Sequence, residues 1–237
     1  MKVIETENDC KETMKTKIKI CGLKSLSDIE VVNELKPEFI GFVFWPKSKR
    51  YITKEEAAVL KEKLNTKIKA VGVFLDAKAE EIAEIANAGI IDYIQLHGHE
   101  DNDFIEDLRK MTDKPVIQAV ILESNSKEEG SLKETQNGTS QNGQPDKDSA
   151  NQRIKVSTAD YILVDSGAGS GKLIDPENLA KVEGEYFLAG GLSPENIEEI
   201  IEKYHPFAVD VSSGVETDGK KDPSKMKDFV EKVRRMQ

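Results

Sequence analysis

Residues 186–204 read YFLAGGLSPENIEEIIEKY and combine a strand, a loop and a helix in one short stretch. Tyr186–Leu188 is an apolar run typical of a buried strand, and two glycines follow it closely. Pro194 stands at a helix start, where its missing N–H is harmless. The apolar positions around and after it recur at helical spacing, at Ile197, Ile200, Ile201 and Tyr204. The stretch therefore predicts one βα unit of a parallel α/β fold.

The same alternation extends along the rest of the chain. Short runs rich in Val, Ile and Phe suit buried parallel strands at Ile18–Cys21, Phe39–Phe44, Ile68–Leu75, Tyr93–Leu96, Val116–Ile121, Tyr161–Val164 and Phe207–Val211. Helical patterns occur at Ser25–Leu35, Lys54–Leu64, Ala79–Ala88, Pro194–Tyr204 and Pro223–Arg234. Open doubly wound sheets usually have fewer strands, and the first turn lacks the glycine pattern of a dinucleotide-binding fold. Eight strands in all predict a closed (β/α)8 TIM barrel of the α/β class.

Two segments fall outside this rhythm. Residues 1–16 form a polar extension, which leaves 17–237 as a single barrel domain. Ser124–Arg153 is rich in Ser, Asn, Gln, Gly, Glu and Lys, and its clearly apolar residues are Leu132 and Ala150. Such a composition buries too little surface to offset the entropy of ordering. Because this segment stands where the fifth helix is due, we expect a disordered insert and a degenerate or replaced fifth helix.

Composition narrows the partners and the compartment. The formal net charge is −10, from 34 basic and 44 acidic residues, which gives no general attraction to nucleic acid or an anionic membrane. No apolar run approaches the length of a membrane helix. The cysteines are Cys10, in the polar extension, and Cys21, at the end of a strand pattern. A disulfide framework is not expected, and a reducing cytoplasm fits best.

In this barrel the active site lies at the carboxyl ends of the strands. Gly190 and Gly191 follow the seventh strand, and Ser213 and Gly214 follow the eighth. Glycines let backbone N–H groups approach a phosphate closely, and the loops after strands seven and eight are the usual phosphate site of this fold. The alternative is that these glycines only make tight turns. The glycine-rich run Gly167–Lys172 is not a nucleotide-binding P-loop, because Leu173 replaces the required Ser or Thr.

Two strand-ending residues suggest acid–base chemistry. Cys21 ends the first strand and Asp165 follows the sixth, so a thiol and a carboxylate facing one site could serve as base and acid. The alternatives are a small buried hydrophobe for Cys21 and a helix cap or ion pair for Asp165. Lys19 shares a strand face with Cys21 and could favour its thiolate, or it could simply reach solvent.

The loop after the second strand, Trp45–Tyr51, contains three cations and two aromatic residues. It suits an aromatic anion, and Arg50 can hold a carboxylate in bidentate fashion. The alternative is a solvated basic loop. His97 and His99 have a spacing seen at some metal sites, but the remaining histidine is His205, so a metal site is not expected.

The motifs at these strand ends resemble those of the phosphoribosylanthranilate isomerase family. They are Lys19–Leu23, Gly41–Phe44 with Ser48–Tyr51, Val71–Phe74, Gln95–Gly98, Leu163–Asp165, Leu188–Leu192 and Val209–Glu216. The match runs in order from about Lys17 to the C-terminus. The resemblance implies a TIM barrel that catalyses an Amadori rearrangement in tryptophan biosynthesis, with no metal or organic cofactor and with a phosphorylated small molecule as its substrate.

The resemblance also implies roles for single residues. Asp165 would be the general acid that opens the ribose ring, and Cys21, as thiolate, would remove the C2′ proton. Arg50 would hold the anthranilate carboxylate, and the backbone around Gly191, Ser213 and Gly214 would hold the phosphate. Further residues implied to line the pocket are Gln95, His97 and Asp210.

Other readings stay open at this point. A related histidine-pathway isomerase would share the phosphate loops but is expected to have an Asp where Cys21 stands. A metal-dependent sugar-phosphate epimerase would need more ligands than His97 and His99 offer. A barrel that only binds a phosphorylated ligand or a protein partner is the alternative outside enzymes, and an activity assay separates it.

Overall fold

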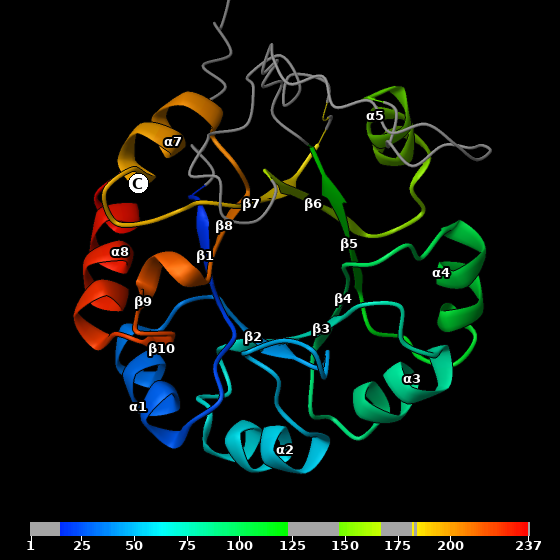
Figure 1. Ribbon diagram of the computed structural model, residues 1–237, viewed down its shortest axis with the longest axis horizontal. Coiled ribbons are helices and arrows are strands. Elements are labelled where there is room, and N and C mark those ends of the chain that lie inside the picture. The colour runs from blue at the N-terminus through cyan, green and yellow to red at the C-terminus, as the bar shows by residue number, and fades with distance from the viewer. Residues whose placement is uncertain (1–14, 123–146, 167–181, 183, 237) are drawn as a thin grey trace, which may run out of the picture.

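The computed structural model describes residues 15–122, 147–166, 182 and 184–236. Eight parallel strands close into a barrel in sequence order, as predicted (Figure 1). They are β1 (Lys17–Cys21), β2 (Phe39–Val43), β3 (Lys69–Phe74), β4 (Tyr93–Leu96), β5 (Val116–Ile121), β6 (Tyr161–Asp165), β7 (Tyr186–Ala189) and β8 (Ala208–Val211). β1 closes the ring, because Lys19 is in register with both Phe39 of β2 and Asp210 of β8.

Helices surround this barrel on the outside (Figure 1). The described ones are α1 (Leu26–Leu35), α2 (Lys54–Lys63), α3 (Ala79–Asn87), α4 (Asn102–Arg109), α5 (Lys147–Val156), α7 (Ile197–Tyr204) and α8 (Pro223–Arg235). A 3-10 turn, η1 (Ser213–Val215), and a small hairpin of β9 (Glu216–Thr217) and β10 (Lys220–Lys221) follow β8. Among the described helices, none has both the length and the apolar character needed to cross a membrane.

Local sequence explains where several helices begin. Ser25 and Thr53 each accept a backbone N–H three residues on, from Asp28 and Glu56, whose carboxylates accept in return. These reciprocal bonds satisfy amide donors that a helix start leaves without partners. Asp222 caps α8 directly before Pro223, the residue type that tolerates the first helical position.

α4 and α5 differ from what the sequence predicts. α4 is not among the predicted helices, although Asp101 caps it and Ile105 and Leu108 are buried at helical spacing. Residues 147–153 of the predicted insert belong to α5, where Ala150 and Ile154 pack against the outer core. The rest of the predicted insert, apart from these seven residues, and most of the N-terminal extension lie outside the described residues.

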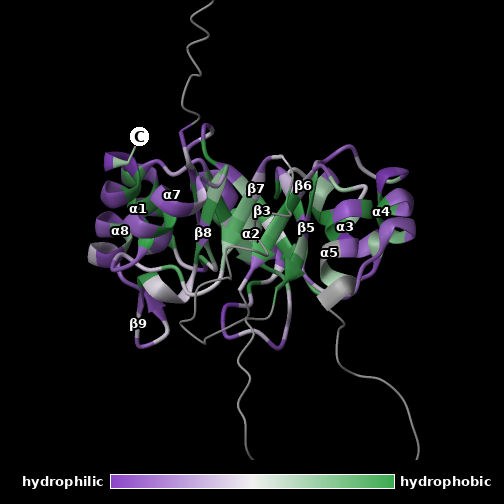
Figure 2. Cartoon of the chain, turned by 90° about the horizontal axis from the view of Figure 1, so that it is seen from above, coloured by the Kyte–Doolittle hydropathy of each residue, from purple (hydrophilic) through white to green (hydrophobic). Residues whose placement is uncertain are grey.

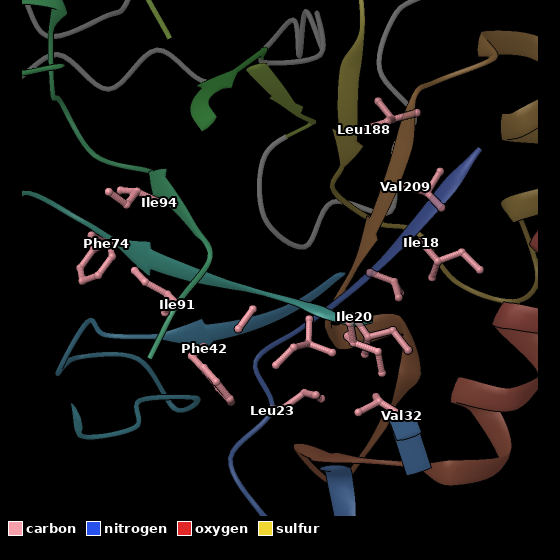
Figure 3. Close-up of a cluster of buried hydrophobic side chains, with 14 of the residues drawn as sticks. Ile18, Ile20, Leu23, Val32, Phe42, Phe74, Ile91, Ile94, Leu188 and Val209 are labelled. Atoms are coloured by element: carbon pink, nitrogen blue, oxygen red, sulfur yellow. The ribbon is translucent and has the colours of Figure 1, made fainter. Parts of the chain in front are cut away.

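The hydrophobic core has an outer and an inner part. Outward-facing strand residues such as Ile18, Ile20 and Phe42 are fully buried against the helices (Figure 3). A smaller inner cluster fills the barrel itself and includes Val71, Leu163 and Phe187. The hydropathy colouring shows apolar strands in the middle and polar outer helix faces (Figure 2). Burial on both sides of each strand accounts for the continuous apolar runs in the sequence.

The amino end of the barrel is closed by a basal aromatic ring of Phe39, Tyr93, Tyr161 and Phe207. Consecutive members have centroid distances of 5.4, 6.2 and 5.5 Å. Phe39, Tyr93 and Tyr161 begin β2, β4 and β6, and Phe207 directly precedes β8, the arrangement by which alternate strands build one layer of a TIM barrel. The ring fills the end of the barrel opposite the expected site.

An acidic residue precedes three members of this ring. Glu38, Asp92 and Asp160 each accept the backbone N–H of a residue at the start of the preceding strand, over 2.8 Å in every case. These donors are Ile18, Ala70 and Val116. Each bond satisfies a main-chain donor at the edge of the barrel, where the sheet ladder supplies none. Three pairs of adjacent strands are therefore joined at the amino end of the barrel by the same carboxylate-to-backbone hydrogen bond.

Candidate active site

Cys21 is the last residue of β1 and lies at the carboxyl end of the barrel. Its side chain is buried against Val43 and Val73. Gly41, its register partner on β2, faces the sulfur so closely that an added Cβ would lie 2.5 Å from Sγ. Real Cβ atoms essentially never come that close to another heavy atom, so a larger residue at this position would have to displace the thiol. The thiol is thus held in a fixed place at the strand end.

Directly below Cys21, Lys19 is fully buried inside the barrel. The possibility that it reaches solvent is therefore wrong. Its Nζ lies 2.6 Å from Oδ2 of Asp210 on the neighbouring strand. Burial opposes the charge on Lys19, but Asp210 and the Cys21 side chain outweigh it and raise the lysine pKa. Lys19 therefore places an ammonium ion beneath the thiol.

Burial raises the pKa of the Cys21 thiol above its usual value. The positive charges of Lys19 and Lys221 act in the opposite direction, and Asp210 adds to the rise. A buried thiolate needs a compensating cation, because a low-dielectric site disfavours the charged form. Lys19 supplies the larger part of that compensation.

Asp165 ends β6 on the other side of the barrel opening. Its Oδ2 lies 3.5 Å from Nε2 of His97, and Nδ1 of His97 lies 2.9 Å from the side-chain nitrogen of Gln95. Burial raises the pKa of Asp210, and its neighbours include both His97 and Asp165. The interior of the barrel beneath Cys21 thus holds a buried Lys19–Asp210 pair, and the charge of Asp165 is near enough to raise the Asp210 pKa further.

Two buried oxygen atoms in this interior have no hydrogen-bond partner among the described residues: Oε1 of Gln95 and Oδ1 of Asp210. Buried acceptors are normally paired, and an orphaned one costs about 1–3 kcal/mol. Both belong to residues predicted to line the substrate pocket. These two oxygens can accept hydrogen bonds from the hydroxyl groups of a polyol.

Arg50 lies on the loop after β2, with its aliphatic stem across Gly22, where any Cβ would collide with it. Its Nε and Nη2 donate to the two carboxylate oxygens of Glu216, over 2.6 and 2.7 Å. Nζ of Lys221 donates to Oε1 of the same carboxylate over 2.7 Å. Burial opposes the charge on Glu216, but its bonds to Arg50 and Lys221 lower the carboxyl pKa. The side chain of Arg50 is the most exposed of the three.

The two glycine loops lie against each other. A Cβ on Gly214 would collide with the backbone carbonyl of Leu192, which follows Gly191. Gly190 and Gly191 have φ values of 91° and 64°, which favour glycine. Within the described chain, the backbone N–H groups of Gly191, Ser213 and Gly214 donate to no other group. The structure therefore brings the predicted phosphate-binding residues together and leaves their backbone N–H groups available as hydrogen-bond donors.

A family model for N-(5′-phosphoribosyl)anthranilate (PRA) isomerase matches residues 18–232. The chain belongs to the N-(5′-phosphoribosyl)anthranilate isomerase family. A relative of that name from Thermoanaerobacter sp. (strain X514) is 40% identical over 222 residues, covering 92% of this chain and 98% of its own. One from Clostridium acetobutylicum is 38% identical over 223 residues, with the same two coverages.

Solved structures of the N-(5′-phosphoribosyl)anthranilate isomerase family also match. The enzyme from Thermotoga maritima has a TM-score of 0.76 at 30% identity, covering 93% of this chain and 99% of its own. Another, in complex with reduced 1-(o-carboxyphenylamino)-1-deoxyribulose 5-phosphate, has a TM-score of 0.73 at 32% identity, with the same coverages. The present chain is therefore an isomerase of tryptophan biosynthesis.

Not every residue singled out from the sequence belongs to this site. His99 is exposed and pairs with Asp76, whereas His97 faces Asp165, so the two histidines do not converge. Gly167–Lys172 lies outside the described residues. Sequence reasoning missed Glu216 and Lys221 as partners of Arg50. The available signal was the charged stretch that begins at Glu216 and ends at Lys220 and Lys221, shortly after the eighth strand.

Proposed function

We propose that this chain converts N-(5′-phosphoribosyl)anthranilate to 1-(2-carboxyphenylamino)-1-deoxyribulose 5-phosphate with Cys21 as base and Asp165 as acid. The observation that supports this most is their placement at the carboxyl ends of β1 and β6, with the buried Lys19–Asp210 pair beneath Cys21. A proton donor and a proton acceptor held at two separate strand ends of one site suit an aldose–ketose rearrangement.

The reaction begins with proton transfer from the Asp165 carboxyl group to the ring oxygen of the ribose. The C1′–O bond breaks, and the amine nitrogen supplies the electrons that form a Schiff base. The Cys21 thiolate then removes the proton from C2′, and the electrons of that C–H bond form an enolamine. The enolamine tautomerises to the ketone product. Lys19 balances the thiolate charge during this sequence.

Substrate binding falls to three groups of residues. Arg50 holds the anthranilate carboxylate, since its guanidinium is both charged and partly exposed. The backbone donors of Gly191, Ser213 and Gly214 hold the phosphate, with Gly190 setting the turn. Gln95, His97 and Asp210 face the sugar hydroxyls, for which two buried oxygens are available.

The reaction needs only these side chains and no metal or organic cofactor. In the proposal the enzyme works in the cytoplasm on a soluble phosphorylated substrate, and neither nucleic acid nor membrane takes part. The net charge of −10 agrees with this, because it favours neither polyanionic partner.

The deciding experiment follows the loss of substrate fluorescence after purified protein is added to freshly made phosphoribosylanthranilate. Rapid loss of fluorescence with formation of the ketose supports the proposal. The substrate of the related histidine-pathway isomerase is assayed in parallel. Turnover of that compound alone would show that the reaction has been misassigned.

A further inference from the structure

Arg50 forms a charged cluster with Glu216 and Lys221, two residues that carboxylate binding by a single arginine would not require. Glu216 receives three donated bonds from the other two residues, all within 2.7 Å. A carboxylate placed this close to Arg50 would compete with any carboxylate of the substrate. Its presence needs an explanation in terms of geometry and charge.

The geometry shows which part of the guanidinium remains available. Glu216 occupies one edge, formed by Nε and Nη2. A guanidinium has five N–H donors, so Nη1 and the second hydrogen of Nη2 form a further edge that can take a carboxylate in bidentate fashion. Among the described residues, none accepts a hydrogen bond from Nη1.

The charge balance depends on Lys221. Arg50 and Glu216 alone would be neutral and would attract an anion weakly. Lys221 adds one positive charge while its side chain is only 2% exposed. Its Nζ also bonds the backbone oxygen of Ser212 over 2.9 Å, so the ammonium stays in place.

We propose that Glu216 and Lys221 are positioning residues for the substrate carboxylate. Glu216 fixes the orientation of the Arg50 guanidinium, and Lys221 leaves the cluster with a net charge of +1, so that the free edge of Arg50 selects an aromatic carboxylate. This inference rests on the proposed function, in which Arg50 meets the anthranilate ring.

The test compares two ligands that differ only in this carboxylate. One is reduced 1-(2-carboxyphenylamino)-1-deoxyribulose 5-phosphate, and the other is its phenylamino counterpart. Their dissociation constants are measured for the wild-type protein and for Arg50→Ala, Lys221→Met and Lys225→Met. Lys225 is the matched control, because its Nζ contacts the backbone oxygen of Glu216 and not the carboxylate.

We expect the wild-type protein and Lys225→Met to prefer the carboxylate-bearing ligand to the same degree. Lys221→Met should lose about tenfold of that preference, since one charge at short range has been removed. Affinity for the phenylamino ligand should stay within a factor of about two. Binding rather than kcat is compared, because Lys221 also lowers the pKa of Cys21. If Lys221→Met does not fold, Lys221→Gln replaces it, because glutamine keeps polar donors without the charge.

An equal loss of affinity for both ligands would show that Lys221 only stabilises the hairpin, and an unchanged preference would also overturn the inference. An unchanged preference in Arg50→Ala would remove the carboxylate from this cluster altogether. Turnover of phosphoribosylanthranilate by the wild-type protein tests the proposed function separately from these outcomes.

Discussion

Gly41 and Cys21 are register partners on adjacent strands, and the thiol occupies the space where a side chain at Gly41 would begin. A methyl group there would lie 2.5 Å from Sγ, so one of the two groups must move. The position of the sulfur thus depends on the absence of a side chain on the neighbouring strand.

Gly41→Ala should therefore reduce kcat by at least about tenfold, because a displacement of about an ångström can greatly slow a positioned reaction. Gly72→Ala on β3 is the control, since its Cβ would meet Ile91 and Phe74 and not the thiol. Both variants should be less stable through overpacking. Equal specific activity of the two folded variants would contradict the role given to Gly41.

Cys21→Ser and Asp165→Asn should each lower kcat by about 10²–10⁴-fold, the usual contribution of a positioned acid or base. Serine is close in size to cysteine but far less acidic, and asparagine cannot deliver a proton. Melting temperature and product affinity should change little. A folded Cys21→Ser protein with near wild-type turnover would end the proposed mechanism.

The pH dependence of kcat/KM tests the role of Lys19. Burial raises the pKa of Cys21, so the thiolate fraction and the rate should increase with pH across the neutral range and above. The double variant Lys19→Met/Asp210→Asn removes the pair without leaving a lone buried charge. Because Lys19 lowers the Cys21 pKa more than Asp210 raises it, the rising limb should move to higher pH. A profile that keeps its position would show that Lys19 does not influence the thiol.

Asp160→Asn should lower the free energy of unfolding by about 1–3 kcal/mol without changing kcat. Asp160 accepts the N–H of Val116 and also pairs with Arg109, and asparagine loses the charge that strengthens both bonds. Asp92→Asn should behave alike, and the two losses should add in the double variant, because the pairs share no partner. Urea unfolding followed by circular dichroism measures them.

Replacing residues 124–146 with a short Gly-Ser linker should leave folding and most activity intact, since the segment is polar and nearly free of apolar residues. The deletion must stop before α5, because Ala150 and Ile154 pack against the core. A second deletion that extends through Arg153 should lower the melting temperature. Equal melting temperatures for the two deletions would argue against a structural role for α5.

The strands were predictable because each is a run of apolar residues buried on two faces. Short elements were harder to foresee. α4 has eight residues, and α5 is largely polar, with Ala150 and Ile154 as its packing side chains. α4 carries a local signal in its Asp101 cap and in Ile105 and Leu108, but it is short, and α5 depends on contacts with the barrel that its polar sequence does not reveal.

The site was predictable only as far as motifs reach. Strand-end positions and the family resemblance pointed to Cys21, Asp165 and Arg50, and their roles remain predictions. Periodicity placed Lys19 on the face of Cys21 but could not tell whether it reaches solvent. The pairing of Arg50 with Glu216 joins residues 166 positions apart, and that of Lys19 with Asp210 spans 191. Such contacts appear only once the barrel closes.

The acidic residues at the base of the barrel also bear on the order in which it assembles. Their bonds join residues 20, 22 and 44 positions apart, whereas Thr16 reaches Pro206 across 190 positions at the closing seam. Because the entropy lost in closing a loop rises with its length, adjacent strand pairs should form early and the β8–β1 seam last. The strand pairs should thus assemble in order along the chain, and Lys19 on β1 should gain its partner Asp210 only in the final step.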